Sequence, residues 1–347
     1  MSFEVSEVLD QEIVHYADSK QLITSKYNVV KIQRNNEIRE ITIPEKPWWI
    51  VFGLARLSRR ALRLDKCNVC PVGDNYVIIR RGRLFHYNFA EKKLTQTLML
   101  GECRNLLTQS ICVSKEGYVY FGEYSRNKKR RPVPVYRSID GGLSWNVIYE
   151  FPAGSIKHVH GCFQDPYTGK IWVTTGDFEN ENILLEASQD FATIRKIGDG
   201  QQRFRTCHLI FKEDFVHWIM DSQLEPCFHI AWKRETGEVV QKNGFNGPVW
   251  YVKELSDGIY LAATVQEIGE GVLDDKIYLY VSKDLETWEE LKTFEHDGLN
   301  KRLFKYGLVG FADGDQASDH LYMYFEAVKD LDGKSLAVDI TSGNKRN

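Results

Sequence analysis

The sequence lacks both a long apolar run and an excess of charge of one sign. No segment approaches the ~20 consecutive apolar residues that span a bilayer, so the sequence predicts no membrane span. Lys and Arg number 45 against 48 Asp and Glu, which gives a formal net charge of −3. Because this balance provides no broad basic field, we expect no dedicated binder of nucleic acid or of anionic membranes.

Cysteine and proline are also scarce, with seven and nine residues in 347. Seven scattered cysteines form no complete disulfide framework, and residues 1–20 lack the basic and apolar regions of a secretory signal. Both features favour reduced thiols and predict a cytoplasmic location. The 43% hydrophobic content is sufficient for a core, and the 12% aromatic content with little helical periodicity favours β structure.

One turn sequence is repeated along the chain. Residues 138–145 read Ser-Ile-Asp-Gly-Gly-Leu-Ser-Trp, and weaker copies occupy residues 188–193 and 282–288. In such a turn Asp and Ser side chains bind the backbone, Gly adopts a positive φ and Trp packs beneath the hairpin. The positions of the three copies fit a repeat of about 47–50 residues, the length of a four-stranded propeller blade.

Further motifs surround the first copy of this turn. They are Phe121-Gly122-Glu123-Tyr124, Asn127, Arg130, Tyr136-Arg137-Ser138, His158-Val159-His160, Asp165-Pro166-Tyr167 and Thr175-Gly176-Asp177, with continuations at 198–205 and 218–222. Together they resemble the sialidase-like β-propellers that carry the Asp-box, or bacterial neuraminidase repeat, and in particular a glycosyl-hydrolase-like bacterial subgroup. The resemblance implies a propeller of four-stranded blades and chemistry on glycans.

The repeat predicts a single all-β propeller domain over residues 1–347, with 1–26 and 341–347 peripheral. Six blades of antiparallel strands are expected, or seven if the N-terminal strands form a blade of their own. The expected limits are 45–97, 98–151, 152–198, 199–246, 247–297, and 298–340 joined to the N-terminus. The run 27–43 is expected to supply the strand that closes the ring. Short helices are expected only in the first ~15 residues and at 54–63.

Second strands of the blades are expected in five aromatic-rich segments, 118–123, 171–177, 217–221, 259–264 and 321–326. In a propeller the ends of these strands and the starts of the innermost strands lie on one face. The turn between the third and fourth strands lies on the opposite face. The turn residues Asp140, Asp190 and Asp284 are therefore predicted to be structural, and the site is predicted on the other face.

Titratable residues gather at the strand ends of that predicted face. Second-strand ends contribute Glu123 with Tyr124, Asp177, Asp221, Glu326, and Gln266 or Glu267. Starts of inner strands contribute His158, His160, Gln202, Arg203, Arg205 and Arg104.

Residues i and i+2 of a strand point to the same side, so His158 and His160 should face one centre. With a carboxylate such as Glu123 or Asp177 they form a candidate divalent-metal site, the one cofactor that the sequence suggests. Without a metal, the same two imidazoles would provide a general base and a substrate contact.

Arg203 and Arg205 are likewise expected to share a strand side, which suits bidentate binding of a carboxylate. The alternative is an ion pair with Asp177 or Asp221. Together with Gln202, Asp221 and Arg104, the two arginines are the predicted substrate contacts.

The leading prediction is an enzyme that cleaves a glycosidic bond in an anionic saccharide. Glu123 and Asp177 would act as acid and as nucleophile or base, with Tyr124 beside them. The chain lacks the Phe-Arg-Ile-Pro segment of true sialidases, so sialic acid is not the expected substrate.

Two alternatives remain open. In a lyase, a histidine or Tyr124 would remove the C5 proton of a uronic acid, while Arg205 or a metal neutralises its carboxylate. In a non-catalytic propeller of polysaccharide biosynthesis, the same face would bind a glycan or a protein.

Two weaker patterns are expected to be structural. The basic run 128–131 and the residues Arg59, Arg60 and Arg63 are interpreted as solvated. Cys67 and Cys70 have zinc-like spacing, but no second pair of ligands accompanies them.

Overall fold

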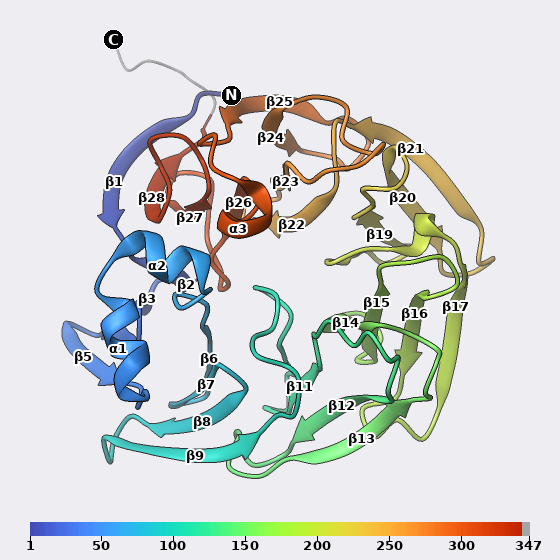
Figure 1. Cartoon of the computed structure of the whole chain (residues 1–347). Helices are drawn as coiled ribbons and strands as arrows, with labels where there is room; N and C mark the ends of the chain where they lie inside the picture. Colours follow the sequence, from blue (N-terminus) through green and yellow to red (C-terminus); the bar gives the residue numbers. More distant parts are fainter. Residues whose placement is uncertain (342–347) are drawn as a thin grey trace. The chain divides into compact units, whose positions relative to one another are not determined.

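The computed structural model describes residues 1–341, so the rest of the segment 341–347 lies outside the described residues. The described chain forms seven four-stranded antiparallel sheets, the blades of a β-propeller (Figure 1). It also has three short α-helices, α1 (Pro47–Gly53), α2 (Arg56–Ala61) and α3 (Lys301–Phe304), and a 3-10 helix at Gln202–Phe204. None of these helices is long and apolar enough to cross a membrane. All seven cysteines are free thiols.

One compact unit, Cys67–Trp250, contains four blades whose strands follow one another along the chain. The strands are β6 (Asn68–Val72), β7 (Asn75–Arg80), β8 (Arg83–Asn88) and β9 (Lys93–Met99); β10 (Cys112–Val113), β11 (Val119–Gly122), β12 (Val133–Ser138) and β13 (Asn146–Phe151); β14 (His158–Gln164), β15 (Ile171–Gly176), β16 (Asn182–Ala187) and β17 (Ile194–Gly200); and β18 (Ile210–Phe211), β19 (Phe215–Ile219), β20 (Cys227–Lys233) and β21 (Val239–Phe245).

The other unit combines Met1–Lys66 with the chain from Tyr251 onward and contains three blades. Two are continuous in sequence: β2 (Ile13–Ala17), β3 (Gln21–Lys26), β4 (Val29–Arg34) and β5 (Glu37–Thr42); and β22 (Val249–Glu254), β23 (Tyr260–Thr264), β24 (Lys276–Ser282) and β25 (Glu289–Glu295). The third combines β26 (Leu308–Phe311), β27 (Leu321–Glu326) and β28 (Lys334–Asp339) with β1 (Glu4–Asp10).

The seven-blade alternative is confirmed, and the N-terminal strands account for the extra blade. β1 pairs with β28, from Glu4 opposite Asp339 to Asp10 opposite Lys334, and completes the last blade. The expectation that residues 27–43 supply this closing strand is wrong, because they form β4 and β5 of a separate blade. Residues 1–26 are strands of two blades, so they are neither peripheral nor helical as expected.

The five expected second strands are confirmed as β11, β15, β19, β23 and β27. The first expected blade, 45–97, begins later than predicted, at β6. The residues before it form α1 and α2, of which only the second was expected from the sequence.

The repeated turn is confirmed between the third and fourth strands, where a closed hydrogen-bond network holds it. Ser138 Oγ donates to Oδ1 of Asp140 at 2.7 Å and accepts from the backbone N–H of Gly142 at 2.8 Å. Asp140 accepts from both the N–H and the hydroxyl of Ser144. The ring of Trp145 packs edge-on against Phe121 at 5.1 Å. Equivalent Ser–Asp contacts recur at Ser188–Asp190 and Ser282–Asp284.

This network predicts the cost of removing one hydroxyl. Ser138 is fully buried, so Ser138→Ala leaves the N–H of Gly142 without its acceptor and should lower the free energy of unfolding by about 1–3 kcal/mol. Urea denaturation measures the loss. Ser144→Ala, on the exposed side of the same turn, is the control and should cost less. Equal stability of Ser138→Ala and the wild type would contradict this role.

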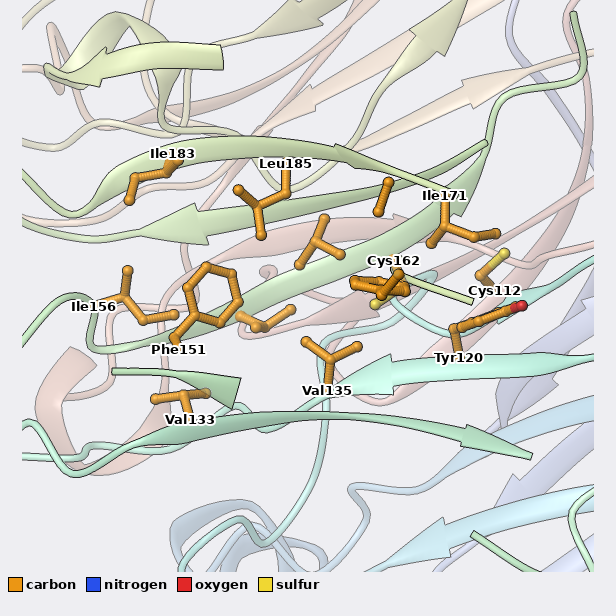
Figure 2. Packing of buried hydrophobic residues seen from close by; sticks show 14 residues of the cluster. Cys112, Tyr120, Val133, Val135, Phe151, Ile156, Cys162, Ile171, Ile183 and Leu185 are labelled. Carbon is orange, nitrogen blue, oxygen red and sulfur yellow. The ribbon is translucent and has the colours of Figure 1, made fainter. Parts of the chain in front are cut away.

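The core of the Cys67–Trp250 unit includes a cluster between neighbouring blades (Figure 2). Tyr120 and Val135 of one blade pack with Ile171 and Leu185 of the next. The blades approach closely at Gly122, where a Cβ atom would lie 2.4 Å from the Cβ of Val159. The absence of a side chain at Gly122 therefore allows the end of β11 to lie beside the start of β14.

Candidate functional site

The strand register places the predicted site and the repeated turn at opposite ends of one blade. His158, the first residue of β14, pairs with Gly176, the last residue of β15, so Asp177 follows directly beside it. At the other end of this blade β16 ends at Ala187, and the turn at Ser188 follows. This arrangement agrees with the prediction that the turn is structural.

Two imidazole nitrogens and one carboxylate oxygen converge in this unit. Nε2 of His158 and Nε2 of His160 each lie 3.2 Å from Oδ1 of Asp177 and 3.1 Å from one another. The other ring nitrogens, Nδ1, lie 2.7 Å from the carbonyl oxygen of Ser125 and 3.0 Å from that of Thr206, respectively. Because a carbonyl oxygen only accepts, these contacts assign the proton of each neutral ring to Nδ1. The three converging atoms then present lone pairs to one another.

Burial opposes protonation of the two imidazole rings, which would otherwise relieve the repulsion between these lone pairs. The residues His158 and His160 are 2% and 1% exposed. Desolvation lowers the pKa of His158 below its ordinary value, although Asp177 opposes the shift. A cation bound between the three atoms would therefore stabilise the arrangement of the imidazole of His158 against the carboxylate.

The geometry fits a divalent metal ion. Nitrogen and oxygen ligands bound to zinc at about 2.0–2.2 Å lie roughly 3 Å from one another, which is the spacing of these three atoms. Histidine ligands also commonly donate their second N–H to a carbonyl group, as both rings do in this site. Two imidazoles and one carboxylate leave coordination positions for water or substrate. Of the two carboxylates considered from sequence, Asp177 rather than Glu123 joins the histidines.

A second group, formed by His160, Cys207 and Asp221, fits a metal less well. All three residues are buried and their ligand atoms lie within 4.8 Å of one another. Burial, together with the adjacent Asp221, raises the pKa of the Cys207 thiol well above its ordinary value. The protonated thiol donates to Oδ2 of Asp221 at 3.2 Å, whereas a metal requires the thiolate.

A buried guanidinium connects the two carboxylates. Arg205 lies 3.4 Å from Oδ1 of Asp177 through Nη2 and 3.4 Å from Oδ2 of Asp221 through Nε. Its Nη1 also donates to Oε1 of Gln223 at 2.7 Å. Lys157 forms an ion pair with the other oxygen of Asp177. Although burial acts against it, the buried guanidinium of Arg205 holds the pKa of Asp177 well below its usual range, so this carboxylate is ionised.

Other predicted residues surround this centre. The ring of Tyr124 lies 4.1 Å from the ring of His158, centroid to centroid. Gln202 is buried and donates to the backbone carbonyl of Asp177 at 3.2 Å. Glu123 is beside β14 through its backbone, but its carboxylate accepts from the hydroxyl of Tyr136 at 3.1 Å. Burial raises the pKa of Glu123 above its ordinary value.

The expectation that Arg203 and Arg205 share one side of a strand is wrong, because Gln202–Phe204 form a 3-10 helix. Arg203 instead pairs with Asp199 at 2.6 Å on the surface, and the alternative prediction, an ion pair of Arg205 with the neighbouring carboxylates, is confirmed. Arg104 is exposed in the loop before β10, and its substrate contact stays a prediction. Glu326 belongs to the other unit, where it pairs with Lys305 at 2.7 Å.

Sequence reasoning missed several residues around Asp177. Lys157 and Phe178 are each adjacent in sequence to a predicted residue, and this adjacency was the available signal. Phe178 is 46% exposed, and Nζ of Lys157 and Cζ of Arg130 each lie 5.4 Å from its ring centroid. Gln223 had no such signal, because it reaches the site only through its contact with Arg205.

No protein-family model matches the chain, and neither does the sequence of any curated protein. Among solved structures, oligogalacturonate lyase from Vibrio parahaemolyticus aligns with a TM-score of 0.59 at 11% identity, over 98% of this chain and 97% of that one. YCF48 from Cyanidioschyzon merolae aligns with a TM-score of 0.57 at 12% identity, over 98% and 99% of the two chains.

The extracellular domain of a putative hybrid two component system from B. thetaiotaomicron aligns with a TM-score of 0.56 at 11% identity. The alignment covers 96% of this chain and 40% of that extracellular domain's chain. At such identities the likeness shows the fold alone, and the β-propeller hosts unrelated activities.

Proposed function

We propose that this protein is a metal-dependent lyase that cleaves an acidic oligosaccharide by β-elimination. The observation that carries this proposal is the convergence of His158, His160 and Asp177, which presents three lone-pair atoms at the spacing of metal ligands. The lyase from Vibrio parahaemolyticus, which has a similar fold, supports a uronic-acid saccharide as the substrate class.

In this reaction a base removes the proton at C5, a double bond forms between C4 and C5, and the C4–O bond breaks. A metal held by His158, His160 and Asp177 would neutralise the substrate carboxylate and thereby acidify the C5 proton. Lys157, whose side chain is 20% exposed beside Asp177, would bind that same carboxylate in this proposal.

Two further side chains complete the proton transfers in this proposal. Tyr124, whose ring packs against His158, is the base that takes the C5 proton. Glu123 retains its proton to a higher pH than an ordinary carboxyl group, so it is suited to protonate the departing oxygen. Arg205 is a positioning residue, because it fixes Asp177 and Asp221 from within the core.

A spectroscopic assay tests the proposal. Oligogalacturonate and other uronate oligosaccharides should give an unsaturated product that absorbs in the near ultraviolet. A chelator should abolish the signal, and added divalent metal should restore it. Tyr124→Phe should lower kcat by about 10²–10⁴-fold, the usual contribution of a positioned acid or base.

The control for this assay is Asp190→Asn, in the turn at the opposite end of the blade, which should leave turnover unchanged. Failure of every uronate substrate, or full activity in His160→Ala, would contradict the lyase. Retention of the saccharide without any product would instead assign a binding role.

Hydrolysis of an anionic saccharide is the second candidate, because the pKa values of Glu123 and Asp177 are displaced in opposite directions. Burial raises the pKa of Glu123, which suits the acid of a glycosidase. The pKa of Asp177 is lowered, which suits its ionised partner. It ranks second because both oxygens of Asp177 are already engaged by cations or imidazoles. Hydrolysis would produce a new reducing end without near-ultraviolet absorbance.

A further inference from the structure

Helices α1 and α2 present an apolar surface that their own unit leaves open to solvent. Trp48, Val51, Phe52, Leu54 and Leu57 are 54%, 65%, 47%, 79% and 54% exposed. The single buried residue of α1 is a glycine, Gly53, which packs against the ring of Tyr27. Nearly the whole outline of α1 is therefore apolar and exposed.

A helix that is apolar on all sides normally lies in a protein core or in a membrane. α1 has seven residues, a length of about 10 Å at 1.5 Å per residue, and this is far too short to cross a bilayer. The exposed side chains therefore require a cover from outside this unit, into which α1 inserts from one side.

The surface extends onto α3 of the same unit. Leu303 and Leu299 are 61% and 41% exposed. α2 and α3 are in contact, because Arg60 donates through Nε to the carbonyl of Phe304 and stacks on its ring at 5.8 Å. We call the exposed side chains of α1, α2 and α3, with Leu299, the α1–α3 surface.

Ion pairs hold α2 against the connections that follow β25 and β27. Arg56 pairs with Asp332 at 2.9 Å, and Arg60 pairs with Asp297. Arg56 and Arg59 also pair with Asp65, just after α2, at 2.6 and 3.0 Å. Arg59 and Arg60 are 4% and 2% exposed, so the interpretation of these arginines as solvated is wrong. Their charges are compensated inside the unit, and the side that faces outward is left apolar.

Local charge indicates what covers the surface. The sequence has no Asp or Glu between Lys46 and Leu64, in contrast to the overall net charge of −3. The exposed cation Lys46 directly precedes α1, and the exposed cation Arg302 belongs to α3. Nζ of Lys46 lies 5.3 Å from the ring of Trp48. Exposed tryptophan beside lysine, with leucine and phenylalanine, is the composition of segments that lie in the interface of an anionic bilayer.

We propose that the α1–α3 surface docks peripherally on an anionic lipid bilayer, with α1 lying in the headgroup region and its apolar side chains inserted. Lys46 and Arg302 would contact lipid phosphates and carboxylates at the rim. This inference is independent of the proposed enzymatic activity, and it departs from the expectation, based on the net charge of the whole chain, of no binder of anionic membranes.

Vesicle flotation of the full chain tests the proposal. The wild type should float with vesicles of phosphatidylcholine and phosphatidylserine, and much less with phosphatidylcholine alone. Leu54→Glu and Val51→Glu should weaken partitioning by at least about tenfold, because a carboxylate must then enter the acyl boundary. The matched control is Ile38→Glu on β5 of the same unit, which is 57% exposed and should float like the wild type.

Thermal unfolding should confirm that all three variants retain the fold, because the substituted side chains are exposed. Absence of wild-type flotation with both kinds of vesicle would overturn the proposal. So would equal loss of flotation in Ile38→Glu and Leu54→Glu. A dimer in sedimentation velocity that Leu54→Glu dissociates, without flotation, would assign the surface to a second copy of the chain instead.

Discussion

Arg205→Met should lower the free energy of unfolding by about 3–5 kcal/mol, the usual cost of removing one partner from a buried ion pair. The side chain of Arg205 is 4% exposed and lies within 3.4 Å of two carboxylates, those of Asp177 and Asp221. Methionine fills a similar volume, so the cost arises from two carboxylates that remain buried without their shared cation. Urea denaturation at neutral pH measures the effect.

Arg203→Met is the matched control, two residues earlier in the chain. Its side chain is 44% exposed and pairs only with the exposed Asp199, so its loss should change stability little. The wild-type pKa of Asp177 is lowered, so its stabilising contribution is complete above the unfolded value and disappears as the pH falls through the folded value. The difference between Arg205→Met and the wild type should therefore narrow in acid. A difference that is the same at neutral and acid pH would contradict this assignment.

Features encoded in contiguous residues were predictable from the sequence. The repeated turn needs only the side chains of residues 138–145, and the second strands carry their pattern locally. The histidine pair follows from alternation along one strand. Although β14 has a bulge between Val159 and Gly161, Nε2 of His158 and of His160 still meet at 3.1 Å.

Features that depend on distant parts of the chain were not predictable. The closing strand is β1 because Glu4–Asp10 pairs with β28, more than three hundred residues later, and residues 27–43 have an equally suitable alternation. The direction of Arg203 depends on a three-residue 3-10 helix, which no periodic pattern reveals. Asp177 joins the histidines because β14 pairs with β15 in one blade, whereas the carboxylate of Glu123, which follows β11 of the neighbouring blade, accepts from Tyr136. The apolar run in α1 has no period that distinguishes an exposed helix from a buried strand.

Glu326→Gln should lower the free energy of unfolding by about 3 kcal/mol, because it leaves a buried lysine without its counter-charge. Oε1 of Glu326 lies 2.7 Å from Nζ of Lys305, and their side chains are 3% and 5% exposed. Lys66 approaches the other oxygen at 3.5 Å. An ion pair of the same length, Lys329 with Glu295 at 2.7 Å, is 61% and 67% exposed. Glu295→Gln is therefore the control, and its unfolding midpoint should match that of the wild type.

The pH dependence distinguishes a lost charge from lost packing in Glu326→Gln. Burial lowers the pKa of Lys305 to about 8, although Glu326 acts in the opposite direction. Without Glu326 this pKa should fall further, so the variant releases the lysine proton at a lower pH than the wild type. A folded base with a lowered pKa gains stability as the pH rises through that pKa. As the pH rises, the variant therefore gains stability at a lower pH than the wild type does. The difference in free energy of unfolding between the two proteins should narrow as the pH approaches 8. A constant difference between pH 5 and 8 would show that packing of the side chain, rather than its charge, stabilises this part of the fold.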